Sequence, residues 1–375
     1  GTLRTARSAA AAPPAALSQL FKRRPIRPGA GFAPLPKPRG AAPYRRALAD
    51  VLGPGRLAAV RRCGALRFHC VGDTGGWRDG LPQSQVAAAM VSDLESDAPA
   101  HFFYHLGDVV YPHGEEAHYG AQFFSPYRDY HAPIFAIPGN HDGEAPTTSG
   151  GSSLDPFLRA FCSPCPPLHD AAVDLRRPPA AQPHVHWTLV HDHLWIVGLY
   201  TNVPEDGEVE DGQLEWLTGE LRDAPPGATV VLAMHRPVYS IDVVHGSNLD
   251  LGDALDDCFA RAGRTPDAVV AAHAHAYQRF TRRVGDRLIP YVVVGSGGFH
   301  ERHAAGTGVP RTPATFPGFD DLRLEAHQAD APGYLTVAVT RSRAEAVYRT
   351  VSATGAVEYD RFAVPRRRGD AGASE

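Results

Sequence analysis

The sequence contains no long hydrophobic run: in 375 residues, no apolar stretch approaches the roughly 18 positions that a helix needs to cross a bilayer. A transmembrane segment is therefore not expected. The chain also lacks a strong charge of either sign, because its formal net charge is −4, and no nucleic-acid partner is expected. Hydrophobic residues make up 43% and charged residues 21% of the chain, which is typical of a globular protein with a sizeable core.

Cysteine is scarce, and the five that are present leave at least one unpaired. Cys162 and Cys165 form a single C-x-x-C, which without a second such pair does not supply the four thiolates of a structural zinc site. Its proline-rich surroundings favour a loop, with closure by a disulfide as one alternative. The cysteines leave the compartment undecided. Because the chain begins at Gly1 and not at Met, secreted, periplasmic and cytoplasmic locations all stay compatible with the sequence.

Acidic residues are absent from the first 48 positions, which carry ten Lys or Arg. We interpret residues 1–54 as a basic, Ala/Pro-rich N-terminal arm that packs against the acidic body or, alternatively, binds a membrane surface or a polyanion. Residues 55–364 are expected to form one large α/β domain. Within it, residues 143–185 are rich in Gly, Ser, Pro and Thr and predict a long irregular insertion. Residues 365–375 are expected to form a basic, flexible tail.

Five short apolar runs each end on a residue type that binds metals. They are 66–71 before Gly72-Asp73, 102–106 before Gly107-Asp108, 133–138 before Gly139-Asn140-His141-Asp142, 230–234 before His235, and 268–272 before His273-Ala274-His275. Short apolar runs are typical of buried strands, and the loops at the carboxyl ends of strands carry the chemistry of α/β sheets. A helix expected over 83–94 makes the first two runs a strand–helix–strand unit, which favours parallel pairing.

The remaining pattern predicts further elements of the same domain. A hairpin is expected over 189–199, with His191-Asp192-His193 at its turn. A helix is expected to begin near 211, with Asp211 as its N-cap. Late strands are expected near 289–294, 334–339 and 346–351.

Seven side chains at or near the strand ends could bind metal: Asp73, Asp108, Tyr111, Asn140, His235, His273 and His275. They combine carboxylate, phenolate, amide and imidazole groups, a mixture that suits iron, manganese or zinc and argues against a thiolate site. Seven ligands suffice for two ions with positions left open for water and substrate. Two ions about 3.5–4 Å apart clamp a phosphoryl group and acidify bound water.

The order of these motifs resembles the calcineurin-like metallophosphoesterase superfamily, and most of all its purple acid phosphatase branch. Gly75 stands where many other branches place a histidine ligand, and Tyr111, three residues after Asp108, offers a ligand in its place. The resemblance covers roughly residues 66–360 and departs at Ala272, where the family usually has Gly. It implies an α/β fold, a four-layer α/β/β/α sandwich with two mixed β-sheets, and makes 55–364 a metallophosphoesterase catalytic domain.

The resemblance also implies a role for each site residue. Fe(III) would be held by Asp73, Tyr111 and His275. A second divalent ion, Fe, Zn or Mn, would be held by Asn140, His235 and His273, with Asp108 bridging the two. His141 would be catalytic beside the leaving group, with Asp142 orienting it.

Three further residues are expected near the substrate: His113, Arg236 and His300. Two other histidine pairs, His184/His186 and His191/His193, are not expected to bind metal.

The implied activity is that of an acid phosphatase. It would hydrolyse phosphate monoesters of small molecules by in-line attack of a metal-bound hydroxide. A phosphodiesterase on the same scaffold is the nearest alternative, because the motif residues act on the phosphoryl group and not on the leaving group. A non-catalytic phospho-ligand-binding protein and an iron redox protein are more remote alternatives. The oligomeric state has no signature in the sequence.

Overall fold

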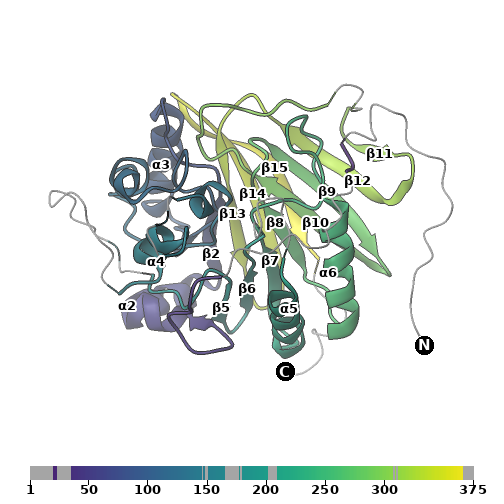
Figure 1. Cartoon of the computed structure of the whole chain (residues 1–375), viewed down its shortest axis with the longest axis horizontal. Helices are drawn as coiled ribbons and strands as arrows, with labels where there is room; N and C mark the ends of the chain where they lie inside the picture. The colour runs from purple at the N-terminus through teal and green to yellow at the C-terminus, as the bar shows by residue number, and fades with distance from the viewer. Residues whose placement is uncertain are drawn as a thin grey trace.

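Two mixed β-sheets pack against each other at the centre of the molecule, with helices outside both (Figure 1). The computed structural model describes residues 20–22, 35–145, 147, 151–164, 177, 180–201, 209–306, 309 and 311–365. No helix among the described residues is both long enough and apolar enough to span a membrane.

The first sheet has six strands in the order β15-β14-β13-β2-β3-β4. Its strands are β2 (Leu66–Val71), β3 (Phe102–His105), β4 (Ile134–Ala136), β13 (Gly333–Val339), β14 (Ala344–Ser352) and β15 (Gly355–Val364). The β2, β3 and β4 strands are parallel, so their carboxyl ends share one edge of the sheet. The three late strands are antiparallel to their neighbours.

The second sheet has nine strands in the order β1-β5-β6-β7-β8-β10-β9-β12-β11. Its strands are β1 (Arg45–Ala47), β5 (Trp187–His191), β6 (Leu194–Gly198), β7 (Thr229–Ala233), β8 (Ala268–Ala271), β9 (Tyr277–Val284), β10 (Arg287–Val294), β11 (Ala314–Phe316) and β12 (Phe319–Gln328). The β6, β7 and β8 strands are parallel, so their ends also share one edge.

Alternate residues of β7 show how the layers are stacked. Val231 and Ala233 belong to the core that includes the six-stranded sheet, whereas Val230 and Leu232 belong to the core formed with the helices α5 (Asp211–Asp223) and α6 (Leu249–Ala262). Successive side chains of a strand point to opposite faces, so this sheet is covered by the other sheet on one face and by helices on the other. The expected four-layer α/β/β/α sandwich is confirmed.

Two of the five α-helices in the described part of the chain were expected from the sequence. The five are α2 (Leu48–Cys63), α3 (Leu81–Leu94), α4 (Asp155–Phe161), α5 (Asp211–Asp223) and α6 (Leu249–Ala262), with three short turns, η1 (Glu116–His118), η2 (Gly120–Phe124) and η3 (His141–Gly143). The helices expected over 83–94 and near 211 are present. The N-cap of α5 is Glu210 and not Asp211, which is the first helical residue. The expected irregular insertion contains α4, whose apolar residues Phe157 and Phe161 pack into the core.

The boundary predicted between residues 54 and 55 lies inside α2, where Gly53 has non-helical torsion angles. Of the expected arm, the described parts contact the body. The Phe21 ring stacks on Phe319 at 4.3 Å, and β1 pairs in parallel with β5. Residues 1–19 and 23–34, and the tail after 365, lie outside the described residues.

Candidate metal centre

The carboxyl ends of β2, β3 and β4 meet those of β7 and β8, although the strands belong to different sheets. The backbone N–H of Asp73 donates to the carbonyl of Gly107 at 3.0 Å, which joins the loops after β2 and β3. The backbone N–H of His273, after β8, donates to Oδ2 of Asp73 at 2.7 Å. The loops that carry the predicted ligands are therefore held together by hydrogen bonds between the two sheets.

Three of the predicted ligands have a left-handed backbone: φ is 55° at Asp73, 54° at Asp108 and 67° at His273. This conformation is unfavourable for residues with a side chain and is concentrated at functional sites. Gly139 makes room for one of these turns, because a Cβ at this position would run into the carboxylate of Asp108. The local strain is compatible with a site that fixes these carboxylates and imidazoles in one place.

One group of ligand atoms surrounds the hydroxyl of Tyr111. The hydroxyl lies 3.3 Å from Oδ1 of Asp73 and 3.2 Å from Oδ2 of Asp108. Nε2 of His275 lies 3.4 Å from the same hydroxyl. It also lies 3.5 Å from Oδ1 of Asp73.

A second group surrounds Nε2 of His235. This nitrogen lies 3.2 Å from Oδ1 of Asn140 and 3.3 Å from Nδ1 of His273. It lies 3.2 Å from Oδ2 of Asp108, the same oxygen that faces Tyr111. Asp108 therefore belongs to both groups. Ligand atoms of Asp108, His235 and His273 all lie within 4.8 Å of one another.

The structure gives a steric reason for the pairing of Gly75 with Tyr111. A Cβ at position 75 would come within 2.7 Å of Cδ2 of Tyr111 and 2.6 Å of Oε1 of Gln122. Gln122 accepts from the backbone N–H of Tyr111 at 2.9 Å and so holds the tyrosine where it is. A side chain at position 75 and a tyrosine at 111 exclude each other.

Backbone carbonyls decide which nitrogen of two histidines faces the site. Nδ1 of His235 lies 2.8 Å from the carbonyl of Leu106, and Nδ1 of His275 lies 2.6 Å from that of Glu301. A carbonyl only accepts, so Nδ1 of each ring carries a proton, and Nε2 is the nitrogen left to face the site. Such outer contacts orient metal-binding imidazoles.

The site concentrates buried acidic groups. Burial raises the pKa of Asp73, and the charge of Asp108 acts in the same direction. Burial, followed by the charges of Asp108 and Asp73, raises the pKa of Tyr111 far above its usual range. Although burial opposes it, the charge of Asp108 raises the pKa of His235 to about 9. A bound cation would reverse this balance and stabilise the ionised oxygens, so the donor set fits a metal.

His141 lies at the rim of the site. Its backbone N–H donates to Oδ1 of Asp108 at 3.0 Å, and its Nδ1 donates to the carbonyl of Pro112 at 2.6 Å. Its ring lies 4.5 Å from that of Tyr111, and its side chain is 32% exposed. These contacts leave Nε2 for a substrate.

The prediction that Asp142 orients the ring of His141 is wrong. The fully buried carboxylate of Asp142 accepts from the backbone N–H groups of Val109 at 3.0 Å and Gly139 at 2.8 Å. Burial and the charge of Asp108 raise its pKa to about 7. Asp142 joins the loops that carry Asp108 and Asn140, and the Pro112 carbonyl orients His141 instead.

The three residues expected near the substrate lie around the site at different depths. His113 is exposed, and its Nδ1 lies 2.9 Å from Oε2 of Glu144. Arg236 is buried, and its charge adds to burial in lowering the pKa of His273. The ring of His300 contacts Phe299, which in turn stacks on Tyr111 at 4.0 Å.

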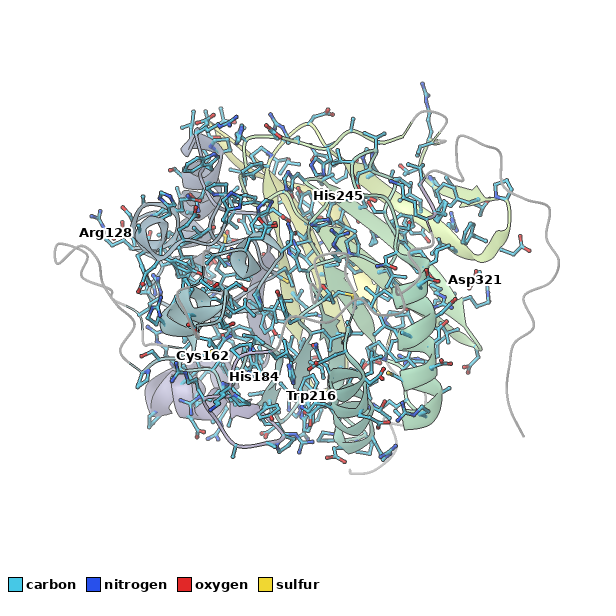
Figure 2. The ribbon with its side chains drawn as sticks, in the orientation of Figure 1. Arg128, Cys162, His184, Trp216, His245 and Asp321 are labelled. Atoms are coloured by element: carbon cyan, nitrogen blue, oxygen red, sulfur yellow. The ribbon has the colours of Figure 1, made fainter. Side chains whose placement is uncertain are left out.

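His245 was not predicted to belong to the site, yet its ring lies only 3.7 Å from that of His273. Figure 2 labels His245 in the upper part of the molecule, above the central strands and α6. His303 similarly stacks on His275 at 4.0 Å, and its Nδ1 accepts from the backbone N–H of that residue. Both lie in irregular loops, where no periodic pattern marks a position. The folding of these loops over the strand ends is what adds them to the site.

Comparison with known families now places the chain. The family described as calcineurin-like phosphoesterase matches residues 66–277, the segment that carries all seven predicted ligands. The chain belongs to this family. The family description is that of phosphoesterases.

Within the calcineurin-like phosphoesterases, the similarity is to purple acid phosphatases. Purple acid phosphatase 22 of Arabidopsis thaliana is 29% identical over 128 residues, which cover 32% of this chain and 28% of that protein. Probable purple acid phosphatase 20 of the same plant is 28% identical over 115 residues, covering 28% of this chain and 26% of that protein. The matches thus span less than a third of either relative.

Solved structures show the same fold. The purple acid phosphatase PPD1 from yellow lupin (Lupinus luteus) seeds has a TM-score of 0.61 and 17% identity, covering 82% of this chain and 55% of that one. GAP50, described as the anchor in the inner membrane complex of Plasmodium, has a TM-score of 0.53 and 15% identity, covering 81% and 90%. One neighbour is named as a phosphatase and the other as an anchor, so the fold alone does not settle activity.

Proposed function

We propose that the chain is a dinuclear metal-dependent phosphatase of phosphate monoesters, of the purple acid phosphatase type. The observation that carries this proposal is the position of Oδ2 of Asp108, 3.2 Å from the Tyr111 hydroxyl on one side and 3.2 Å from Nε2 of His235 on the other. A carboxylate shared by two sets of ligands is what a bridge between two ions requires.

The two groups of ligand atoms and the family resemblance support the following assignment. Asp73, Tyr111 and His275 would hold Fe(III), and Asn140, His235 and His273 would hold a second ion, Fe, Zn or Mn, with Asp108 between them. Such a pair of ions acidifies water and neutralises the charge of a phosphoryl group. The phenol and the two buried carboxyl groups are oxygen ligands whose ionised forms a cation would stabilise, which supports the assignment.

The protein itself positions the substrate and moves a proton. Because the Pro112 carbonyl holds Nδ1 of His141, Nε2 is the atom that faces the leaving group and donates a proton or a hydrogen bond to it. His113 and His300 at the rim, and the buried Arg236, would contact a small phosphorylated substrate. Asp142 acts on the loops and not on the substrate.

Parallel assays distinguish the monoesterase from the diesterase. The metal-loaded protein is offered p-nitrophenyl phosphate and bis(p-nitrophenyl) phosphate, and we expect the higher kcat/KM on the monoester. Asp108→Asn serves as the inactive control. A clear preference for the diester would contradict the proposal and favour the phosphodiesterase.

The same experiment tests the remote alternatives. Neither substrate would be hydrolysed by a phospho-ligand-binding protein, and an iron redox protein would show oxidation turnover without phosphate release. The presence of all seven predicted ligands in one cluster favours the enzyme over a binding protein that has lost its site.

A further inference from the structure

Apart from the metal centre, the described part of the chain contains a cavity of about 580 Å³ at the opposite end of the two sheets. Leu66 at the start of β2, Trp195 near the start of β6 and Val339 at the end of β13 line it. Since β2 runs from Leu66 towards Asp73 and strands rise about 3.3 Å per residue, the cavity lies roughly 20 Å from the metal centre. In Figure 1 this is the lower end, where α2, β5 and β6 lie.

The interior of the cavity is apolar. Its aliphatic walls come from both sheets and from α2, and include Leu57, Val60, Leu66, Val190 and Val339. Trp195 adds an aromatic wall and is 7% exposed. The volume is that of small-molecule sites, which are mostly apolar with a few polar groups that fix orientation.

The polar groups of the cavity are predominantly basic. Arg61 from the last turn of α2 and Arg341 from the β13–β14 turn line it, together with His191 at the end of β5 and His193 from the β5–β6 turn. Among the described residues that line the cavity, Asp192 is the single acidic one. Burial lowers the pKa of His191. The charge of Asp192 raises this pKa, whereas the charges of His193 and Arg61 lower it further, so these groups lie close together.

We propose that this cavity is a second binding site, which takes a small organic anion with an apolar body. The body would fill the space beside Trp195 and Val339, and the anionic group would face Arg61, Arg341 and the two histidines. Inorganic phosphate would leave the apolar walls without contacts, and an organic cation would meet the arginines with like charge. The His191/His193 pair is then a hydrogen-bonding element of this site and not a metal ligand.

The test uses two probes with the same rings. The first is 1-anilinonaphthalene-8-sulfonate, and the second is N-phenyl-1-naphthylamine, which lacks the sulfonate. Fluorescence titration of the full chain should show one saturable site for the anionic probe. The dissociation constant of the neutral probe should be higher by about tenfold or more, because a charge-assisted contact contributes at least that factor. The double variant Arg61→Gln/Arg341→Gln should lose about tenfold in affinity for the anion only.

Two further variants make the test specific. Ala49→Trp, at an exposed position that lines the cavity, should block both probes by filling the space. Arg128→Gln removes an arginine that is 56% exposed and does not line the cavity, and it should leave the binding of both probes unchanged. Unchanged hydrolysis of p-nitrophenyl phosphate confirms that each variant is folded.

Three results would overturn the proposal. Equal affinity for the two probes would show that the basic groups are not used. Unaltered binding in both the double variant and Ala49→Trp would place the probe elsewhere. Displacement of the anionic probe by inorganic phosphate, or its loss in Asp108→Asn, would assign it to the metal centre.

Discussion

At the scale of single residues, the hydrogen bonds that a side chain makes outside the site decide which of its atoms can act as a ligand. The sequence identifies His235 and His275 as ligand candidates, but it does not show which ring nitrogen of each faces the site. A carbonyl on Nδ1 of each leaves Nε2 as the ligand atom. Tyr111 is likewise one of several buried tyrosines, and it is distinguished by the two carboxylates within 3.3 Å of its hydroxyl.

Tyr111→Phe should remove the visible absorption of the Fe(III)-loaded protein without unfolding it. A phenolate bound to Fe(III) gives a charge-transfer band, whereas the phenyl ring keeps its stacking on Phe299 at 4.0 Å. Absorbance spectra of the two proteins measure the difference. Tyr119→Phe is the matched control, since Tyr119 is also buried but its hydroxyl has no hydrogen-bond partner among the described residues. If Tyr111→Phe keeps its colour, Tyr111 is not an iron ligand.

Asp142→Ala should destabilise the protein by about 3 kcal/mol, because the buried backbone N–H groups of Val109, Val110 and Gly139 lose their acceptor. Denaturant unfolding of the metal-free protein measures the change. Asp79→Ala is the control: Asp79 also accepts a backbone N–H, from Leu81 at 3.0 Å, but it is exposed and should cost less than about 1 kcal/mol. Similar losses in the two variants would mean that the Asp142 contacts contribute little.

At the scale of elements, each ligand follows a short buried strand, and the turn after the strand requires particular neighbours. The turn at Asp108 depends on the close approach of Gly139, which itself directly precedes Asn140. The two strand ends are thus coupled: a change in one glycine moves ligands on both loops.

Gly139→Ala should lower metal affinity at least about tenfold, the usual effect of disturbing the groups that support a ligand. The added Cβ would displace the Asp108 carboxylate. Metal content after dialysis and phosphate release from p-nitrophenyl phosphate both report the loss. Gly120→Ala, where a Cβ would have nothing within 4 Å, should retain both. Full metal content in Gly139→Ala would show that the turn can adjust.

At the scale of the whole molecule, the metal centre joins the two sheets. Four of the predicted ligands follow strands of the six-stranded sheet, and His235, His273 and His275 follow strands of the nine-stranded sheet. Ions bound between them would tie the halves of the sandwich together. Without cations, the buried carboxylates and the imidazoles must share protons instead.

Removal of metal should therefore lower the unfolding temperature of the whole domain. An ion whose free concentration is 100 times its Kd stabilises the folded state by about 2.7 kcal/mol. Calorimetry with and without a chelator measures the shift, and adding back iron and zinc should reverse it. Asp108→Asn should respond much less. An unfolding temperature that is the same with and without chelator would contradict binding of metal between the sheets.

Much of the site follows from local sequence. Short apolar runs that end on Asp, Asn or His predicted the strands and the sheet edge at which the ligands gather. Gly75 in place of a histidine ligand, together with Tyr111 as a substitute ligand, predicted the branch of the family. The strands β9, β11, β12 and β15 were not predicted; β15 alternates less clearly because its outer residues are largely exposed. The helix α4 was missed because it is short and lies among loop-forming residues.

The sequence by itself determined which residues are ligand candidates and in which order they follow the strands, because strand patterns and turn glycines are local signals. Only the tertiary structure decided that Asp142 ties loops together and does not hold His141, and that His245 covers His273. It also brought Arg61, Arg341 and the turn at His191 around one cavity. These contacts join segments far apart in the chain, and packing between the two sheets, not any nearby residue, sets the distances between them.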